Sequence, residues 1–453
     1  MGLKSGDNGC KAVFQTQFAS AFLACPRLDD VRELVGVARS ETLAVLDGNV
    51  MVKGMPQSAT TFREYVQILV AQTAPAIEAA AHVVIVFDEP RAMTRAKLET
   101  QKSRDAKSQA QTPMCSEELV ACISTDEFTE EMLHADGCNV RMLMNHRAAR
   151  PRFYDALCAA ILAHFVENTS GDAAWSLTFD GVDPRGFARE FNAPRKAGIL
   201  SSDDAFWRPL LHRQTPIGEG DIKLTDVAQR VHDAAKHEST PVHGVVLNLL
   251  VTIDTDSLVI ELLKQQERLA RTDESDRNEL TIVCLKEHAR RRKGDDFITP
   301  SRFLCCNAAR LHADVAAYLA PARSEDRNAA VALLVAACAC CGCDFLEVKG
   351  ARADLMLPVV KDIVRRHPEV LRDMARIFDK DEAGVREATP AINTVLKAYA
   401  DDIANKPRMK RSHASASNYC DAQVLRALWT VSYWYGREFL DCADWGFASE
   451  SVA

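Results

Sequence analysis

The sequence lacks a run of apolar residues long enough to cross a membrane. A spanning helix needs about 18 to 20 consecutive apolar residues, and no such run occurs in the 453-residue chain. The first residues, MGLKSG, also lack a secretory signal, and Gly6 stands where a myristoylation signal has Ser or Thr. These absences predict a protein without membrane contact, located in the cytoplasm or the nucleus.

Two further classes of protein are not expected. The 55 basic residues are outnumbered by 63 acidic ones, and the net charge of −8 excludes a broadly basic nucleic-acid coat while leaving room for a local basic groove. The 15 cysteines are an odd number without a secretory signal, which favours free thiols over a disulfide scaffold. With 47% hydrophobic and 26% charged residues, the composition is that of an ordinary globular protein.

Four short apolar runs predict β-strands that are buried on both faces. They are TLAVLD (42–47), HVVIVFD (82–88), HGVVLNLLVTID (243–254) and LTIVCL (280–285). The runs are nearly continuous rather than alternating, and helical patterns such as residues 62–81 separate most of them. We therefore expect an α/β fold with a mostly parallel central sheet, flanked by helices on both faces.

The polar stretches of the chain suggest its organisation. Residues 107–118 and 167–204 have the character of loops or insertions, and residues 405–418 that of an exposed linker before a last helix. We expect a core at residues 1–360, with insertions around 107–204, and a helical C-terminal segment at 361–453 that completes a substrate channel.

Acidic residues recur where the predicted strands end. In an open α/β sheet these ends line the ligand crevice. Seven carboxylates form the candidate set, namely Asp47, Asp88, Glu219, Asp221, Asp254, Asp256 and Asp344. Such a cluster repels itself unless divalent cations neutralise it, and oxygen ligands without His or Cys favour Mg²⁺ or Mn²⁺. Each residue alone is more often a helix cap or a loop residue, so the prediction depends on the whole set.

The carboxylates occur in motifs that resemble those of the flap-endonuclease-like (PIN-like) nucleases, most closely the Xrn-type 5′→3′ exoribonucleases. The motifs are LAVLDGN, IVFDEP, PIGEGDIK, TIDTDSL and CGCDFL. PIGEGDIK is similar to that family's PGEGEHKI, with Asp221 in place of its second Glu, and the long interval from Asp256 to Asp344 suits the same branch. The resemblance implies that all seven carboxylates are catalytic and hold two Mg²⁺ ions, which Mn²⁺ can replace. It also implies that the apolar run ACACCGC is a buried helix that ends at the metal ligand Asp344.

The segment RAKLETQKSRDAKS (95–108) is the candidate site for the 5′ end of a substrate. If the segment is helical, Lys97, Gln101 and Arg104 share one face, where they would bind a terminal phosphate or form a solvated basic surface. The segment resembles the RAKMNQQRSRR of the Xrn family, which forms a pocket for a 5′-monophosphate. Asp105 stands where that family has a second Arg.

The C-terminal segment VLRALWTVSYWYGREFLDCADW (424–445) is rich in aromatic residues. Spacing favours a core position in a helix for Trp429, Tyr433 and Trp434. The resemblance implies that Trp445 stacks on the first base of the substrate and places Lys53 where the family has a histidine partner.

These features predict a hydrolase that degrades single-stranded RNA from a 5′-monophosphate end. One alternative is a flap endonuclease that acts on DNA junctions, although VKGARAD (348–354) has a single glycine where that branch has a glycine-rich motif. Another is a degenerate RNA-binding protein of the same fold, which retention of all seven carboxylates opposes. The clustered cysteines at 338–343 lack a second Cys/His pair, so they are expected in the core rather than on a metal.

Overall fold

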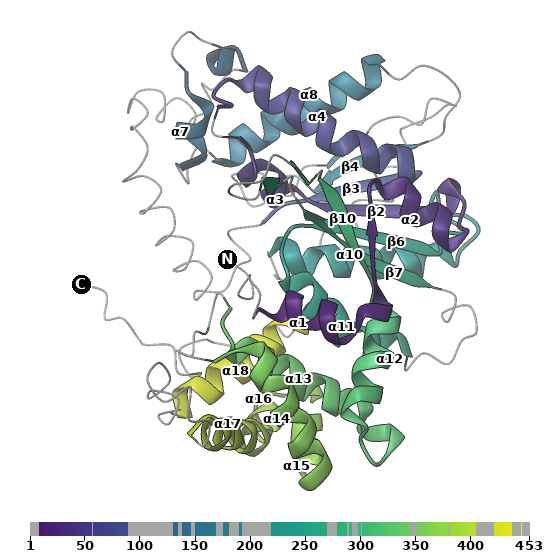
Figure 1. Ribbon diagram of the computed structural model, residues 1–453. Helices are drawn as coiled ribbons and strands as arrows, with labels where there is room; N and C mark the ends of the chain where they lie inside the picture. Colours follow the sequence, from purple (N-terminus) through teal and green to yellow (C-terminus); the bar gives the residue numbers. More distant parts are fainter. Residues whose placement is uncertain are drawn as a thin grey trace.

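The computed structural model shows a central β-sheet between helices, with further helices beyond one of these layers (Figure 1). The structure describes residues 9–56, 58–88, 130–134, 138–145, 150–168, 175–180, 190–192, 219–269, 279–287, 290–291, 298–299, 301–343, 346, 351–379, 381–404, 421–436 and 445.

The described strands form one eight-stranded sheet and a separate two-stranded ribbon. In spatial order the sheet contains β1 (Phe22–Cys25), β10 (Arg302–Asn307), β7 (Leu280–Glu287), β6 (Leu247–Thr252), β2 (Thr42–Asp47), β3 (His82–Val86), β4 (Ser176–Asp180) and β5 (Glu190–Asn192). The ribbon pairs β8 (Arg290–Arg291) with β9 (Ile298–Thr299). The strands from β7 to β4 are parallel, whereas β1, β10 and β5 are attached in antiparallel pairs. The expected mostly parallel α/β sheet is confirmed.

Helices cover both faces of the sheet, which explains the continuous apolar character of its central strands. Every residue of β2 and of β3 is buried. One face is covered by α2 (Leu28–Val35), α4 (Phe62–Ala79) and α8 (Arg150–Asn168), and the other by α10 (Gly220–Ala235), α11 (Asp256–Leu269) and α12 (Ala308–Leu319). A side chain on either side of these strands therefore enters a hydrophobic core.

A group of helices packs beyond α11 and α12. It consists of α13 (Arg327–Cys340), α14 (Ala353–Arg366), α15 (Val370–Ala375), α16 (Glu382–Arg386), α17 (Thr389–Ala404) and α18 (Asp421–Trp434). The remaining described α-helices are α1 (Cys10–Gln17), α3 (Gly48–Lys53) and α7 (Val140–Asn145). No helix in the described ranges combines the length and the apolar character that a membrane crossing requires.

The helix α13 confirms the expectation for the cysteine-rich run in part, because the run is buried but its helix ends at Cys340, and Asp344 lies outside the described residues. Every residue from Ala329 to Cys340 is buried, because α13 packs against α11, α14 and α18 on different sides. Cys338, Cys340 and Cys341 are free thiols in this core. Burial raises the pKa of Cys340 to about 12, so this thiol stays protonated at neutral pH.

Two expectations about the organisation of the chain need correction. Residues 167–204 are not simply a loop or an insertion, because β4 within them pairs in parallel with β3 and all five of its residues are buried. The expected boundary after residue 360 falls inside the continuous helix α14, which packs on both α13 and α17. The C-terminal helices therefore share one core with the sheet layer.

We expect Gly48→Ala to destabilise the fold, because the first residue of α3 faces an aromatic ring. A Cβ at Gly48 would lie 2.5 Å from Cε1 of Phe87, whose ring is buried and packs on Tyr154. Overpacking of this kind lowers the free energy of unfolding by about 1 to 3 kcal/mol, measurable by urea denaturation. The same change in a Phe87→Leu background should cost much less, and an equal cost in both backgrounds would contradict the explanation.

Candidate functional site

Three of the predicted acidic residues follow strands that are neighbours in the sheet. Asp47 ends β2, Asp88 comes two residues after β3, and Asp254 comes two residues after β6. The spatial order β6, β2, β3 places these parallel strands side by side, so their carboxyl ends lie along one edge. The alignment is the one that the sequence predicts.

Asp47 and Asp88 approach each other at Gly220, the first residue of α10. The N–H of Gly220 donates a hydrogen bond to Oδ1 of Asp88 at 2.8 Å. A Cβ built on Gly220 would lie 3.2 Å from that oxygen and 3.5 Å from Oδ1 of Asp47. Both carboxylates therefore border the space that the missing side chain leaves. Any larger residue at 220 would compete for this space.

The start of α10 brings two further carboxylates to the same edge. Glu219 precedes the helix and is 4% exposed, while Asp221 lies in its first turn. Oδ1 of Asp221 accepts a hydrogen bond from Oγ of Ser257 at 3.0 Å. Because Ser257 follows Asp256 at the start of α11, this bond joins the two acidic helix starts.

Asp254 and Asp256 are held by a local turn. The N–H of Asp254 donates to Oγ1 of Thr252 at 3.0 Å, and the N–H of Asp256 lies 3.4 Å from Oδ1 of Asp254. Cys10 lies close enough for Asp256 to affect its titration. The pKa of Cys10 is raised well above its usual value, by a hydrogen bond with Cys338, then by burial, with a smaller contribution from Asp256. Cys10 is thus a buried thiol that stays protonated at neutral pH.

Helix capping explains part of this arrangement but not all of it. Oδ1 of Asp47 accepts the N–H of Val50 at 3.0 Å and caps α3, and acidic residues in the first turns of α10 and α11 suit the helix dipoles. Capping of separate helices does not require Asp47 and Asp88 to border the same glycine. Their convergence brings negative charges together at a cost that a cap does not need.

The oxygen donors around Gly220 fit a hard divalent cation in their chemistry. Within the described ranges, however, no three Asp, Glu, His or Cys side chains are arranged to enclose one ion. Asp344, the seventh predicted carboxylate, lies outside these ranges. The described carboxylates alone therefore do not surround an ion, and the two-ion centre stays a prediction.

The structure also identifies residues near this edge that the sequence reasoning missed. Asn49 is 5% exposed, and its Nδ2 has no hydrogen-bond partner in the described structure while lying 3.4 Å from the Gly220 Cβ position. Asp180 ends β4 and forms a buried ion pair with Lys223 of α10. Lys223 also donates to the carbonyl of Phe87 at 2.9 Å. The sequence signal for Asp180 was weak, because its strand SLTFD alternates polar and apolar residues before the aspartate.

The predicted substrate-binding residues are mostly outside the described structure. Lys97, Gln101 and Arg104 lie there, as does the side chain of Lys53, so the phosphate pocket stays a prediction. Trp445 is described and is fully buried, with the guanidinium carbon of Arg386 4.2 Å from its ring centre. Stacking on a base would require this ring to become exposed.

The aromatic residues of α18 occupy the core, as their spacing predicts. Trp429, Tyr433 and Trp434 are each at most 1% exposed. The rings of Trp429 and Tyr433 stack with their centres 5.0 Å apart. They stabilise the packing of α18 on α13 rather than forming a surface for bases.

Comparison of the chain with protein-family models and with curated proteins finds no match.

Proposed function

We propose that this protein is a metal-dependent exonuclease that hydrolyses single-stranded RNA from a 5′-monophosphate end. The observation that carries the proposal is the approach of Asp47 and Asp88 around Gly220, at the edge where α10 and α11 begin with acidic residues. The order of the acidic motifs supports the RNA substrate and the direction of attack. Both rest on the resemblance to the Xrn-type enzymes.

Backbone N–H groups hold two of the carboxylates in place. Asp88 accepts a hydrogen bond from the N–H of Gly220, and Asp47 accepts one from the N–H of Val50. Asp47, Asp88, Glu219 and the pair Asp254/Asp256 would hold Mg²⁺. The bound ions would supply an activated water and stabilise the leaving oxygen of the phosphodiester.

The amide of Asn49 lies beside the two carboxylates at Gly220. The amide of Asn49 presents Nδ2 to the same space as the two carboxylates. An N–H donor there would hydrogen-bond a phosphate oxygen of the substrate, which the carboxylates alone would repel. Asn49 is accordingly a candidate for orienting the scissile phosphate.

The proposal is tested with single-stranded RNA labelled at its 5′ or 3′ end and carrying a 5′-phosphate, 5′-hydroxyl or 5′-triphosphate. We expect mononucleotides from the 5′-phosphorylated RNA in the presence of Mg²⁺, with the 3′-labelled chain shortening progressively. Excess EDTA should stop the reaction, and added Mg²⁺ should restore it, because the acidic edge requires a cation.

The matched control is a DNA flap of the same sequence. Discrete cuts at the junction with linear RNA left intact would replace the proposed substrate with the flap alternative. Full turnover in EDTA would contradict the metal-dependent mechanism for either substrate. Binding of RNA without any cleavage would favour the degenerate RNA-binding alternative.

A further inference from the structure

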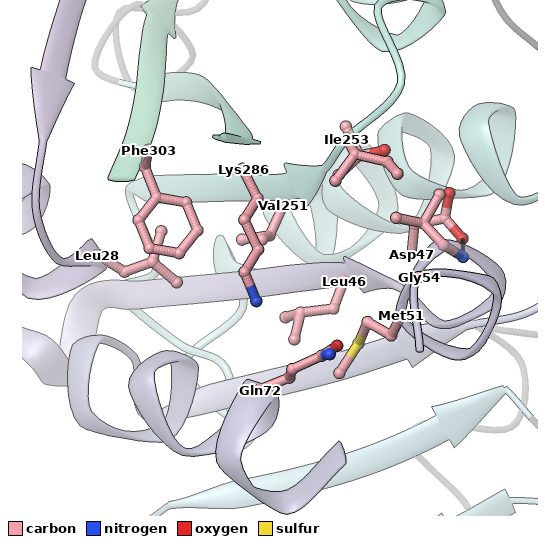
Figure 2. Close-up of a pocket in the computed structure, with 12 residues that line it drawn as sticks. Leu28, Leu46, Asp47, Met51, Gly54, Gln72, Val251, Ile253, Lys286 and Phe303 are labelled. Atoms are coloured by element: carbon pink, nitrogen blue, oxygen red, sulfur yellow. Dashed lines mark hydrogen bonds between the residues drawn. The ribbon is translucent and has the colours of Figure 1, made fainter. Parts of the chain in front are cut away.

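A second site lies beside the carboxylate edge, on the face of the sheet that α2 and α4 cover. Figure 2 shows a pocket between the ends of β2, β6 and β7 and the helices α2, α3 and α4. The space that it encloses is about 30 Å³, and the wider hollow of about 470 Å³ around that space includes open solvent. Its walls are largely apolar, and they include Leu28, Leu46, Met51, Val251 and Phe303. Apolar walls with a few polar groups are typical of sites for small organic molecules.

The amino group of Lys286 lies within these apolar walls. Along β7, Ile282 and Cys284 belong to the core between the sheet and α4, so alternation puts Lys286 on the same face. In Figure 2 its side chain extends toward Leu46 and Gln72. The half-buried neighbour Glu287 points to the opposite face.

The ammonium of Lys286 has no counter-ion in the described structure. Glu287, the adjacent acidic residue, is already paired with Lys11 at 2.7 Å and with Arg302 at 2.9 Å. Burial lowers the pKa of Lys286, which shows the cost of keeping this charge among apolar side chains. An anionic group bound here would offset that cost and form a charge-assisted hydrogen bond.

The pocket is asymmetric along its length. Phe303 and Leu28 lie at the Lys286 end, whereas Asp47 and Gly54 lie at the other end (Figure 2). An anion is attracted to the first end and repelled by the carboxylate at the second. The walls between the two ends are apolar. The rest of a matching ligand is therefore an uncharged, apolar group.

We propose that this pocket binds a small anionic amphiphile, with its acid group on Lys286 and its apolar body along Leu46, Met51 and Phe303. The site borders the proposed nuclease site, because Asp47 lines both, but ligand binding at Lys286 does not depend on nuclease activity. The ligands that we expect are carboxylates or sulfonates with one aromatic or aliphatic group.

The probe for this site is 8-anilinonaphthalene-1-sulfonate, which has one sulfonate and an aromatic body. Titration of the folded chain, followed by fluorescence and calorimetry, should show one saturable site, and decanoate should displace the probe. Lys286→Met should weaken binding about 10- to 150-fold, the value of one charge-assisted contact. Lys286→Arg should retain most of the affinity, since it retains the charge.

Lys361→Met is the matched control, because Lys361 lies on α14 against the ring of Tyr318 and away from the pocket. It should leave probe binding unchanged. The melting temperature of Lys286→Met should not fall, since the change removes a half-buried charge from apolar surroundings. Equal probe affinity for Lys286→Met and the unchanged protein, no saturable site, or failure of decanoate to compete would each overturn the proposal.

Discussion

Asp254→Asn and Asp256→Asn are each expected to lower the rate of RNA hydrolysis by about 10³-fold or more. The two residues follow β6 at the acidic edge, and Asp256 is only 5% exposed. Loss of a metal-holding carboxylate removes several kcal/mol of transition-state stabilisation, and about 4 kcal/mol corresponds to about 10³-fold in rate. Single-turnover cleavage of 5′-phosphorylated RNA measures the effect.

Stability measurements distinguish a catalytic carboxylate from a structural one. Removing one of several neighbouring negative charges relieves repulsion, so in EDTA the melting temperature of these variants should stay equal or rise. Asp362→Asn is the matched control, because Asp362 forms exposed ion pairs with Arg365 and Arg366 on α14. It should leave both activity and stability unchanged. Lower stability of the Asp254 and Asp256 variants with normal cleavage would assign them a structural role.

The strands that the sequence predicts correctly are those that form continuous apolar runs. β2, β3, β6 and β7 form such runs, because helices cover the sheet on both sides. β4 is also buried throughout, but its sequence, SLTFD, alternates polar and apolar residues and does not stand out from the polar stretches around it. Its place beside β3 depends on pairing between segments about 90 residues apart, which periodicity cannot indicate.

The sequence indicates which residues belong to the candidate site, but it does not indicate how they are arranged. Aspartates at the ends of parallel strands meet at one edge, so the positions of Asp47 and Asp88 follow from the fold class. The role of Gly220 does not, because it depends on how α10 approaches both strands. The burial of Trp445 beneath Arg386 depends likewise on contacts between distant segments.

Asp180 lies near the candidate site but was not predicted, because its strand β4 was not predicted. This carboxylate ends β4, and its side chain is 3% exposed. Its partner Lys223 also binds the carbonyl of Phe87, immediately before Asp88. Lys223 lies one turn after Glu219, so the two contacts attach the acidic start of α10 to β3 and β4. The pair positions the carboxylates without itself belonging to the proposed metal ligands.

We expect Lys223→Met to lower the free energy of unfolding by about 3 to 5 kcal/mol, because it leaves the carboxylate of Asp180 buried without its cation. Asp180→Asn in the same chain removes that buried charge, so the double variant should recover a large part of the loss. Urea denaturation of the four members of this cycle isolates the coupling energy between the two side chains. Lys236→Met is the matched control, since Lys236 lies at the other end of α10 with a 3.8 Å contact to Asp233 at the surface. An equal cost of Lys223→Met with and without Asp180 would mean that the lysine does not act through Asp180.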